Sequence, residues 1–132
     1  MVKLSEKLSS IVLTFNGEDY LEKCLKNLSR VSDELLVVDS GSSDGSLDIA
    51  KKYASKIKYH KFENYGRQCS FAVSKTMNDM VLVVDQDEIL SEELIEEIKL
   101  LKKNGFQHDG YFIKRDNFLF GKHVKYSGWG NE

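Results

Sequence analysis

The sequence predicts an α/β fold built around a mostly parallel sheet. Two observations carry this prediction: short apolar runs alternate with amphipathic segments four times, and the loops between them are short. Repeated strand–helix units of this kind form parallel sheets with right-handed crossovers. The sequence has no proline, no internal repeat and no low-complexity stretch, so we treat residues 1–132 as one domain.

Four apolar runs are the expected strands. The run SIVLTF is continuous rather than alternating, which is typical of a strand covered on both faces. The run MVLVVD is the most hydrophobic of the four. The expected strands are residues 10–15, 34–39, 57–62 and 80–85.

Amphipathic segments at helical spacing follow the four strands. We expect Asn16 to cap the first helix, Asp44 or Ser43 the second and Ser91 the last, because such side chains accept hydrogen bonds from a first turn. Acids after Ser91 and lysines before Gly105 suit the helix dipole. The expected helices are residues 17–29, 44–54, 66–76 and 91–104, and residues 110–126 predict antiparallel or irregular β structure.

The composition bounds the function. Hydrophobic residues make up 41% and charged residues 30% of the chain, as in an ordinary globular domain. A formal net charge of -2 excludes a general nucleic-acid binder, which needs clustered positive charge. Cys24 and Cys69 lack metal-ligand spacing, and we expect free thiols in a reducing compartment. Without a signal-like or membrane-length apolar run, we expect a cytoplasmic protein, with peripheral membrane contact left open.

Polar loops follow three of the apolar strands directly, at residues 14–18, 39–45 and 85–88. In open α/β sheets, ligands bind beyond the carboxyl ends of the strands. The three loops should therefore converge on one ligand site.

The second of these loops begins with Asp39. Its carboxylate can accept a hydrogen bond from a nucleobase N–H or a ribose hydroxyl, and the small residues Ser40 and Gly41 let a ligand approach the backbone. The alternative interpretation is that Asp39 and Asp44 serve only as turn and capping residues.

The third loop carries a pair of acids, Asp85 and Asp87. Alternate residues of an extended segment point the same way, so both carboxylates can face one cation or one diphosphate. Mg²⁺ and Mn²⁺ favour carboxylate and phosphate oxygens. The alternative is a solvated acidic loop that leads into the helix at Ser91.

Three segments in order carry a resemblance to a known family: residues 10–25 (SIVLTFNGEDYLEKCL), 35–46 (LLVVDSGSSDGS) and 78–90 (NDMVLVVDQDEIL). They resemble the inverting glycosyltransferases of family 2, whose GT-A fold is a Rossmann-like three-layer sandwich. The stretch at residues 110–132, which contains a Gly-Trp motif followed by an acid, is similar to the subgroup of bacterial lipopolysaccharide-core glycosyltransferases.

This resemblance implies a nucleotide-sugar donor, a UDP-sugar by expectation, and a saccharide or lipopolysaccharide-core acceptor. It implies that Thr14, Phe15 and Asn16 lie beside the nucleobase, and that Asp39 contacts the nucleobase or the ribose. Ser40 stands where relatives commonly have a second acid. Five further residues are expected to contact the donor or its cation: Gly41, Arg67, Asp85, Gln86 and Asp87. Of these, Asp85 and Asp87 are expected to hold Mg²⁺ or Mn²⁺.

The resemblance also implies a general base, which deprotonates the acceptor hydroxyl. The matching acid is Glu132, the last residue. Because relatives continue beyond this position, we expect a C-terminally truncated domain that binds the donor and transfers sugar poorly. Apolar residues around Phe118, Phe120 and Trp129 would then favour self-association.

Two other functions compete with this interpretation. Phosphohydrolases of the haloacid-dehalogenase type also carry two Asp residues two apart after an apolar strand, but there the motif comes first in the chain, whereas here it follows the fourth strand. The second alternative is a non-catalytic fragment that binds nucleotide without transferring sugar.

Overall fold

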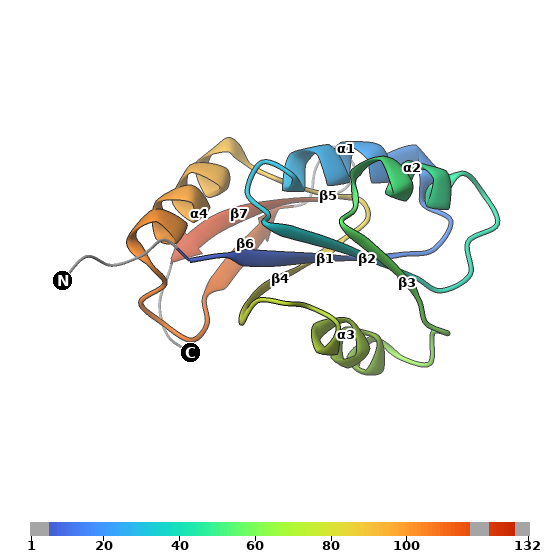
Figure 1. Ribbon diagram of the computed structural model, residues 1–132. Coiled ribbons are helices and arrows are strands. Elements are labelled where there is room, and N and C mark those ends of the chain that lie inside the picture. Colours follow the sequence, from blue (N-terminus) through green and yellow to red (C-terminus); the bar gives the residue numbers. More distant parts are fainter. Residues whose placement is uncertain (1–5, 117–121, 129–132) are drawn as a thin grey trace.

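The computed structural model describes residues 6–116 and 122–128, and it contains the predicted alternation of strands and helices (Figure 1). The elements lie close to their expected positions, although the third strand ends three residues early, at Tyr59. In chain order they are β1 (Leu8–Thr14), α1 (Glu18–Leu28), β2 (Glu34–Asp39), α2 (Ser46–Tyr53), β3 (Lys56–Tyr59), α3 (Tyr65–Ser74), β4 (Met80–Asp85), β5 (Glu88–Leu90), α4 (Glu92–Asn104), β6 (Phe112–Asp116) and β7 (Lys122–Gly128).

The first four strands form one sheet in the order β3-β2-β1-β4, and every neighbouring pair is parallel. The predicted parallel sheet is therefore confirmed. Its register places Thr14 opposite Asp39 and Leu13 opposite Asp85. The carboxyl ends of β2, β1 and β4 thus lie side by side along one edge of the sheet.

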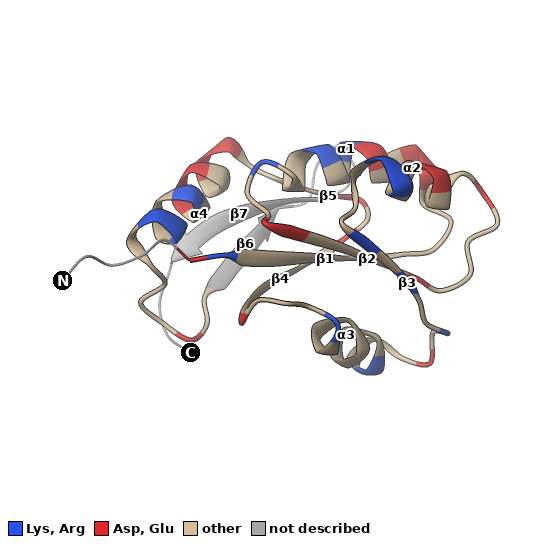
Figure 2. Cartoon of the chain, in the orientation of Figure 1, with Lys and Arg blue, Asp and Glu red and all other residues tan. Residues whose placement is uncertain are grey.

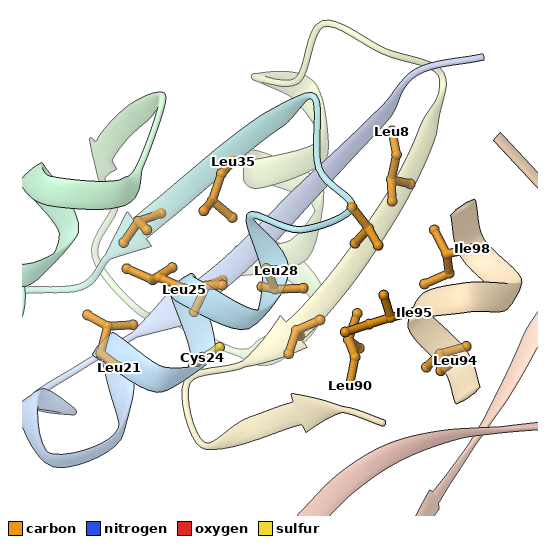
Figure 3. Close-up of a cluster of buried hydrophobic side chains, with 14 of the residues drawn as sticks. Leu8, Leu21, Cys24, Leu25, Leu28, Leu35, Leu90, Leu94, Ile95 and Ile98 are labelled. Atoms are coloured by element: carbon orange, nitrogen blue, oxygen red, sulfur yellow. The ribbon is translucent and has the colours of Figure 1, made fainter. Parts of the chain in front are cut away.

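Helices cover both faces of this sheet, which gives the expected three layers (Figure 1). On one face, α1, α2 and α4 pack over a large apolar cluster, and a fully buried Leu in such a cluster contributes about 1.5–3 kcal/mol. Figure 3 shows the centre of this cluster between α1, α4 and the sheet: Leu8, Leu21, Cys24, Leu25, Leu28, Leu35, Leu90, Leu94, Ile95 and Ile98. On the other face, α3 packs Ala72 against Ile11, Leu36 and Val38.

A second, smaller sheet has the order β5-β7-β6. β6 and β7 are antiparallel, as residues 110–126 predict, whereas β5 pairs in parallel with β7. β5 is a correction to the sequence analysis, which assigned Glu88 to a polar loop. Its three residues are too few to show a period, and the Glu88 side chain is completely buried.

The helix ends differ in detail from expectation. Asn16 does not cap α1: it has a positive φ of 46°, and the N-cap is Gly17. At α2 the N-cap position falls on Gly45, but the Asp44 carboxylate still accepts from the Ser46 N–H at 2.9 Å. The cap at Ser91 is confirmed, since its hydroxyl accepts from the Leu94 N–H at 3.1 Å.

The surface carries mixed charge. Figure 2 shows acidic and basic residues on α1, α2 and α4, in keeping with the small net charge, and in α4 the acids lie in the first half and the lysines in the second. Cys24 and Cys69 are free thiols, as predicted. Within the described part of the chain, no helix combines the length and the apolarity needed to cross a membrane.

Candidate functional site

The three predicted loops meet at a cavity of about 330 Å³ at the carboxyl ends of β1, β2 and β4. This convergence is the arrangement that the polar loops predict. A larger apolar cavity of about 430 Å³ lies at the other end of β4 and contains none of the predicted site residues. The smaller cavity is lined by Leu13, Thr14, Phe15, Ser40, Phe62, Tyr65, Gln68, Asp85, Gln86 and Asp87.

The loops after β1 and β2 are tied to each other by reciprocal hydrogen bonds. The Asn16 N–H donates to the Ser42 hydroxyl at 2.9 Å, and the Asn16 side-chain oxygen accepts from the Ser43 N–H at 2.8 Å. Asn16 is therefore a bridge between loops, and it does not line the cavity. The expected position of Asn16 beside the nucleobase stays a prediction.

A second set of hydrogen bonds links the N-terminal ends of α1 and α2, with side chains from each end accepting from the main chain of the other. The Glu18 N–H donates to Asp44, while the Gly45 N–H donates back to the Glu18 carboxylate. The Gly17 N–H donates to the Ser46 hydroxyl at 2.9 Å. Hydrogen bonding by Ser46 lowers the pKa of Asp44, which keeps this cap ionised at neutral pH. The two loops are thus held in a fixed relation before any ligand binds.

Asp39 organises its own loop. Its side chain is buried, and one carboxylate oxygen accepts from the N–H groups of Gly41 and Ser42, each at 2.9 Å. Gly41 adopts a positive φ of 118°, a conformation that favours glycine. The turn role considered for Asp39 is therefore present in the structure. Ser40 lines the cavity, whereas Asp39 and Gly41 lie behind it.

Asp85 and Asp87 both line the cavity, although not for the reason expected. Residues 86 and 87 form a turn between β4 and β5 rather than an extended segment. The turn is held from behind, because the buried Glu88 carboxylate accepts from the Asp85 N–H at 2.8 Å. The two acids are thus displayed by a tight, anchored turn, and the alternative of a solvated acidic loop is wrong for Glu88.

Cys24 of α1 lies behind the same turn. Its thiol approaches the Asp85 carbonyl oxygen at 3.6 Å. Burial, together with the nearby carboxylates of Glu88, Asp87 and Asp85, raises the pKa of this thiol. Cys24 therefore stays protonated at neutral pH, which argues for a packing role and against a nucleophilic one.

Gln86 spans the space between the acid pair and the β1 loop. Its side-chain oxygen accepts from the Thr14 hydroxyl and from the Phe15 N–H, and its amide nitrogen donates to the Phe15 carbonyl oxygen. Thr14, Phe15 and Gln86, three of the expected donor-binding residues, therefore form one connected unit.

The structure does not place two further predicted residues, Arg67 and Glu132, in the lining of this cavity, for different reasons. Arg67 is exposed on α3, where its guanidinium lies 3.7 Å from Glu63, and it is absent from the cavity lining. Its reach to a diphosphate stays a prediction. Glu132, the expected general base, lies outside the described residues.

The sequence analysis missed four residues of the cavity wall: Leu13, Phe62, Tyr65 and Gln68. Phe62 was placed inside a strand, but β3 ends before it. Gln68 is buried and pairs with His60, donating from its amide to the His60 carbonyl oxygen at 3.0 Å. The available signal was the cluster of aromatic residues from the end of β3 to the first residue of α3, at Tyr59, Phe62 and Tyr65.

Two solved structures share this fold. TarS of S. aureus in complex with UDP aligns with a TM-score of 0.57 and 27% identity, covering 72% of this chain and 31% of that chain. Glucosyl-3-phosphoglycerate synthase from Mycobacterium tuberculosis, in complex with Mn²⁺, UDP and glucosyl-3-phosphoglycerate, aligns with a TM-score of 0.56, covering 64% of this chain and 36% of that chain. Its identity of 20% supports likeness of fold alone. Both neighbours are GT-A glycosyltransferases, so the expected GT-A fold is confirmed.

Two relatives extend the comparison to sequence. An uncharacterized glycosyltransferase of Rickettsia conorii is 38% identical over 98 residues, which are 74% of this chain and 35% of that protein. The lipopolysaccharide core biosynthesis glycosyltransferase LpsC of Rhizobium meliloti is 29% identical over 119 residues, which are 86% of this chain and 44% of that protein. The chain therefore spans about a third of the length of the first relative and less than half of the second.

Comparison with a model of a whole protein family identifies the family of this chain. The profile of glycosyl transferase family 2 matches residues 9–126, which include all three loops of the cavity. This match gives no support to the phosphohydrolase alternative. The chain belongs to glycosyl transferase family 2, a family of transferases, as its loop motifs indicate.

Proposed function

We propose that this chain binds a nucleotide-diphosphate sugar, with UDP as the nucleotide, in the cavity at the carboxyl ends of β1, β2 and β4. The sugar is then transferred, with inversion, to a saccharide or a lipid-linked saccharide such as lipopolysaccharide core. One observation carries the proposal: two carboxylates, Asp85 and Asp87, share a cavity with the aromatic ring of Phe15. A nucleotide diphosphate needs both a cation site and a flat apolar face.

The base half of the cavity is aromatic. Phe15, Phe62 and Tyr65 line it, with exposed fractions of 53%, 54% and 51%. Rings that are only half covered keep a face available, and a nucleobase stacked on such a face gains about 1–3 kcal/mol. The Asp39 loop, with Ser40 at the wall, supplies the polar contacts to base or ribose in this proposal.

The phosphate half is acidic, which requires a cation. Among the described residues no group of three or more His, Cys, Asp or Glu side chains could hold a metal ion by itself. Asp85 and Asp87 fit a Mg²⁺ or Mn²⁺ ion that completes its shell with diphosphate oxygens and water, as these ions prefer. When bound, such an ion would supply positive charge to offset the charge that develops on a departing diphosphate.

The comparisons support the donor and the acceptor at different strengths. TarS, at 27% identity, was solved with UDP, which supports UDP here. LpsC is named for lipopolysaccharide core biosynthesis, which supports a core saccharide acceptor. A lipid-linked acceptor would place the protein at the cytoplasmic face of the membrane. Glu132 remains our candidate for the general base.

The decisive experiment is a thermal-shift comparison of UDP, GDP, ADP and CMP, each with Mn²⁺ and with EDTA. We expect UDP with Mn²⁺ to stabilise the protein most, since a ligand at 100 times its Kd adds about 2.7 kcal/mol. Asp87→Asn should remove the effect of Mn²⁺, and Asp85→Asn should weaken UDP binding itself. Asp79→Asn is the matched control, because Asp79 is exposed and precedes the first residue of β4, at the end of the strand away from the acid pair.

Three outcomes would count against the proposal. No shift with any nucleotide at millimolar concentration overturns the donor site. Equal affinity for UDP in EDTA and in Mn²⁺ overturns the metal role of the acid pair. UDP binding without release of sugar from UDP-sugars in the presence of acceptor saccharides favours the non-catalytic alternative instead.

A further inference from the structure

Gln86 makes an unusually complete set of contacts for a residue in a surface turn. Its amide oxygen accepts from the Phe15 N–H at 3.0 Å, and its amide nitrogen donates to the Phe15 carbonyl oxygen at 3.2 Å. The same oxygen also accepts from the Thr14 hydroxyl. One side chain thus satisfies both polar groups of the Phe15 main chain, across 71 residues of sequence.

The amide lies in a slot that the fold provides. A Cβ atom at position 17 would overlap the Gln86 amide, so the slot exists only because residue 17 is glycine. Gly17 is itself fixed, since its N–H donates to the buried Ser46 hydroxyl. The missing side chain at position 17 leaves the space that the Gln86 amide fills, so we interpret the contact as a specific part of the site.

The position of Gln86 in the chain gives the contact its consequence. Gln86 lies between Asp85 and Asp87, so it belongs to the turn that holds the phosphate half of the cavity. Phe15 and Thr14 belong to the base half. The amide connects the two halves through side-chain hydrogen bonds, beyond the point where β1 and β4 pair. It also occupies the Phe15 N–H and C=O groups that a nucleobase edge could otherwise pair with.

We propose that Gln86 is a positioning residue that fixes the Phe15 ring for base stacking and keeps the Phe15 main chain from reading the base. This inference rests on the proposed nucleotide site and deepens it. Base selection then comes from the polar groups of the Asp39 loop, while the aromatic walls supply stacking that is tolerant of the base. Gln86 acts on the base half through Phe15 and leaves the cation and diphosphate contacts of Asp85 and Asp87 in place.

The test uses three probes: UDP with Mn²⁺, uridine, and pyrophosphate with Mn²⁺, each measured by calorimetry. Gln86→Met keeps the length of the side chain and removes its hydrogen bonds. We expect it to weaken UDP and uridine by about the same factor, on the order of tenfold. Pyrophosphate affinity should stay unchanged. Arg30→Met, in the exposed Arg30–Glu92 pair beyond α1, is the control and should change none of the three.

Gly17→Ala provides an independent route to the same contact. The added methyl group should displace the Gln86 amide and weaken uridine binding in the natural background. In a Gln86→Ala background it should have little further effect, because substitutions that act on one contact are not additive. Gln86→Glu, which can accept from Thr14 and Phe15 but cannot donate to the Phe15 carbonyl oxygen, should show an intermediate loss and serves if Gln86→Met does not fold.

The results separate this inference from the proposed function. Absence of nucleotide binding by the natural chain overturns the proposed function. If the natural chain binds UDP, unchanged uridine affinity in Gln86→Met overturns the positioning role. An equal loss of pyrophosphate affinity also overturns it, because a general disturbance of the turn would then explain the effect. Additive effects of the Gly17 and Gln86 substitutions overturn the shared contact.

Discussion

β2 and β4 have nearly the same sequence, ELLVVD and MVLVVD, and both lie parallel to β1. Their surroundings are nevertheless different. All six residues of β2 are buried, whereas in β4 only Val84 is buried. β2 lies between β1 and β3, and β4 pairs with β1 alone among the described strands.

The comparison shows that local sequence selects the strand, while position and register in the sheet decide what its terminal acid does. Asp39 lies opposite Thr14 and Asp85 opposite Leu13, so the two acids are on different faces of the sheet. At the central strand, Asp39 is enclosed and its carboxylate holds the loop that follows. At the outer strand, Asp85 lines the cavity, and the main chain rather than the side chain makes the bond to Glu88. One acid therefore holds the loop in place, and the other lines the cavity.

The largest expected difference concerns Leu36 and Leu82, each the third residue of its strand, which pack on opposite faces of the sheet. Leu36 is completely buried, and Leu36→Ala should lower the free energy of unfolding by about 3 kcal/mol, as is usual for a core leucine. Leu82 is half-buried beside the 430 Å³ cavity, so Leu82→Ala should cost about 1 kcal/mol. Urea unfolding measures both values. Equal losses would mean that β4 is as enclosed in solution as β2.

The two terminal acids should separate stability from binding. Asp39→Ala removes the acceptor for the Gly41 and Ser42 N–H groups, and we expect a loss of about 2 kcal/mol in the free energy of unfolding. Asp85→Asn should change that free energy by roughly 0.5 kcal/mol or less, yet weaken UDP binding. Thermal melting without ligand, followed by titration with UDP, distinguishes the two effects. A strong loss of stability in Asp85→Asn would contradict the division of roles.

Sequence reasoning found the four parallel strands because uninterrupted apolar runs such as ELLVVD have few alternatives in a chain with short loops. It also found the three loops, since strand ends in parallel sheets converge. It could not rank β2 above β4, because strand order is set by long-range packing that near-identical hexapeptides do not encode. For the same reason it missed Phe62 and Tyr65, whose approach to the cavity depends on where α3 packs.

Asn16 illustrates a second limit. Its type and position favour a helix cap, but the tertiary structure offers its side chain the Ser43 N–H of a neighbouring loop. Glu88 illustrates a third, because a carboxylate in an acidic run looks solvated until β5 and its buried contact with the Asp85 N–H are known. Local propensity was outweighed in both cases by contacts between segments distant in sequence.

The first residues of β2 and β4 should contribute differently to the dependence of stability on pH. β2 begins with the buried Glu34, whereas β4 begins with Met80. Burial acts to raise the pKa of Glu34, but hydrogen bonds from the Met77 N–H and the Ser9 hydroxyl, with Lys56 nearby, outweigh it and hold the pKa below its ordinary value.

A carboxyl group whose pKa is lower in the folded state stabilises the fold above its unfolded pKa, and that contribution is lost as the pH falls through the folded pKa. The melting temperature should therefore fall as the pH drops below the ordinary Glu range. Glu34→Gln should flatten this dependence, whereas Glu93→Gln, at an exposed position of α4, should leave it unchanged. A slope that is the same in all three proteins would contradict the role of Glu34.

The smallest expected effect is local, and native-state hydrogen exchange can measure it. In β2, amides that point to either side have a neighbouring strand from Leu36 onward, and the Leu35 N–H donates to the Ser55 hydroxyl, so the β2 amides should be protected to near the level of global unfolding. In β4, only the alternate amides that point toward β1 have a partner strand among the described residues. The others should exchange sooner, apart from the Asp85 amide, which donates to the buried Glu88 carboxylate. The prediction requires an alternating pattern in β4 and a uniform one in β2. Uniform protection of both strands would contradict it, because every outward amide of β4 would then need a hydrogen-bond acceptor from another segment or another copy of the chain.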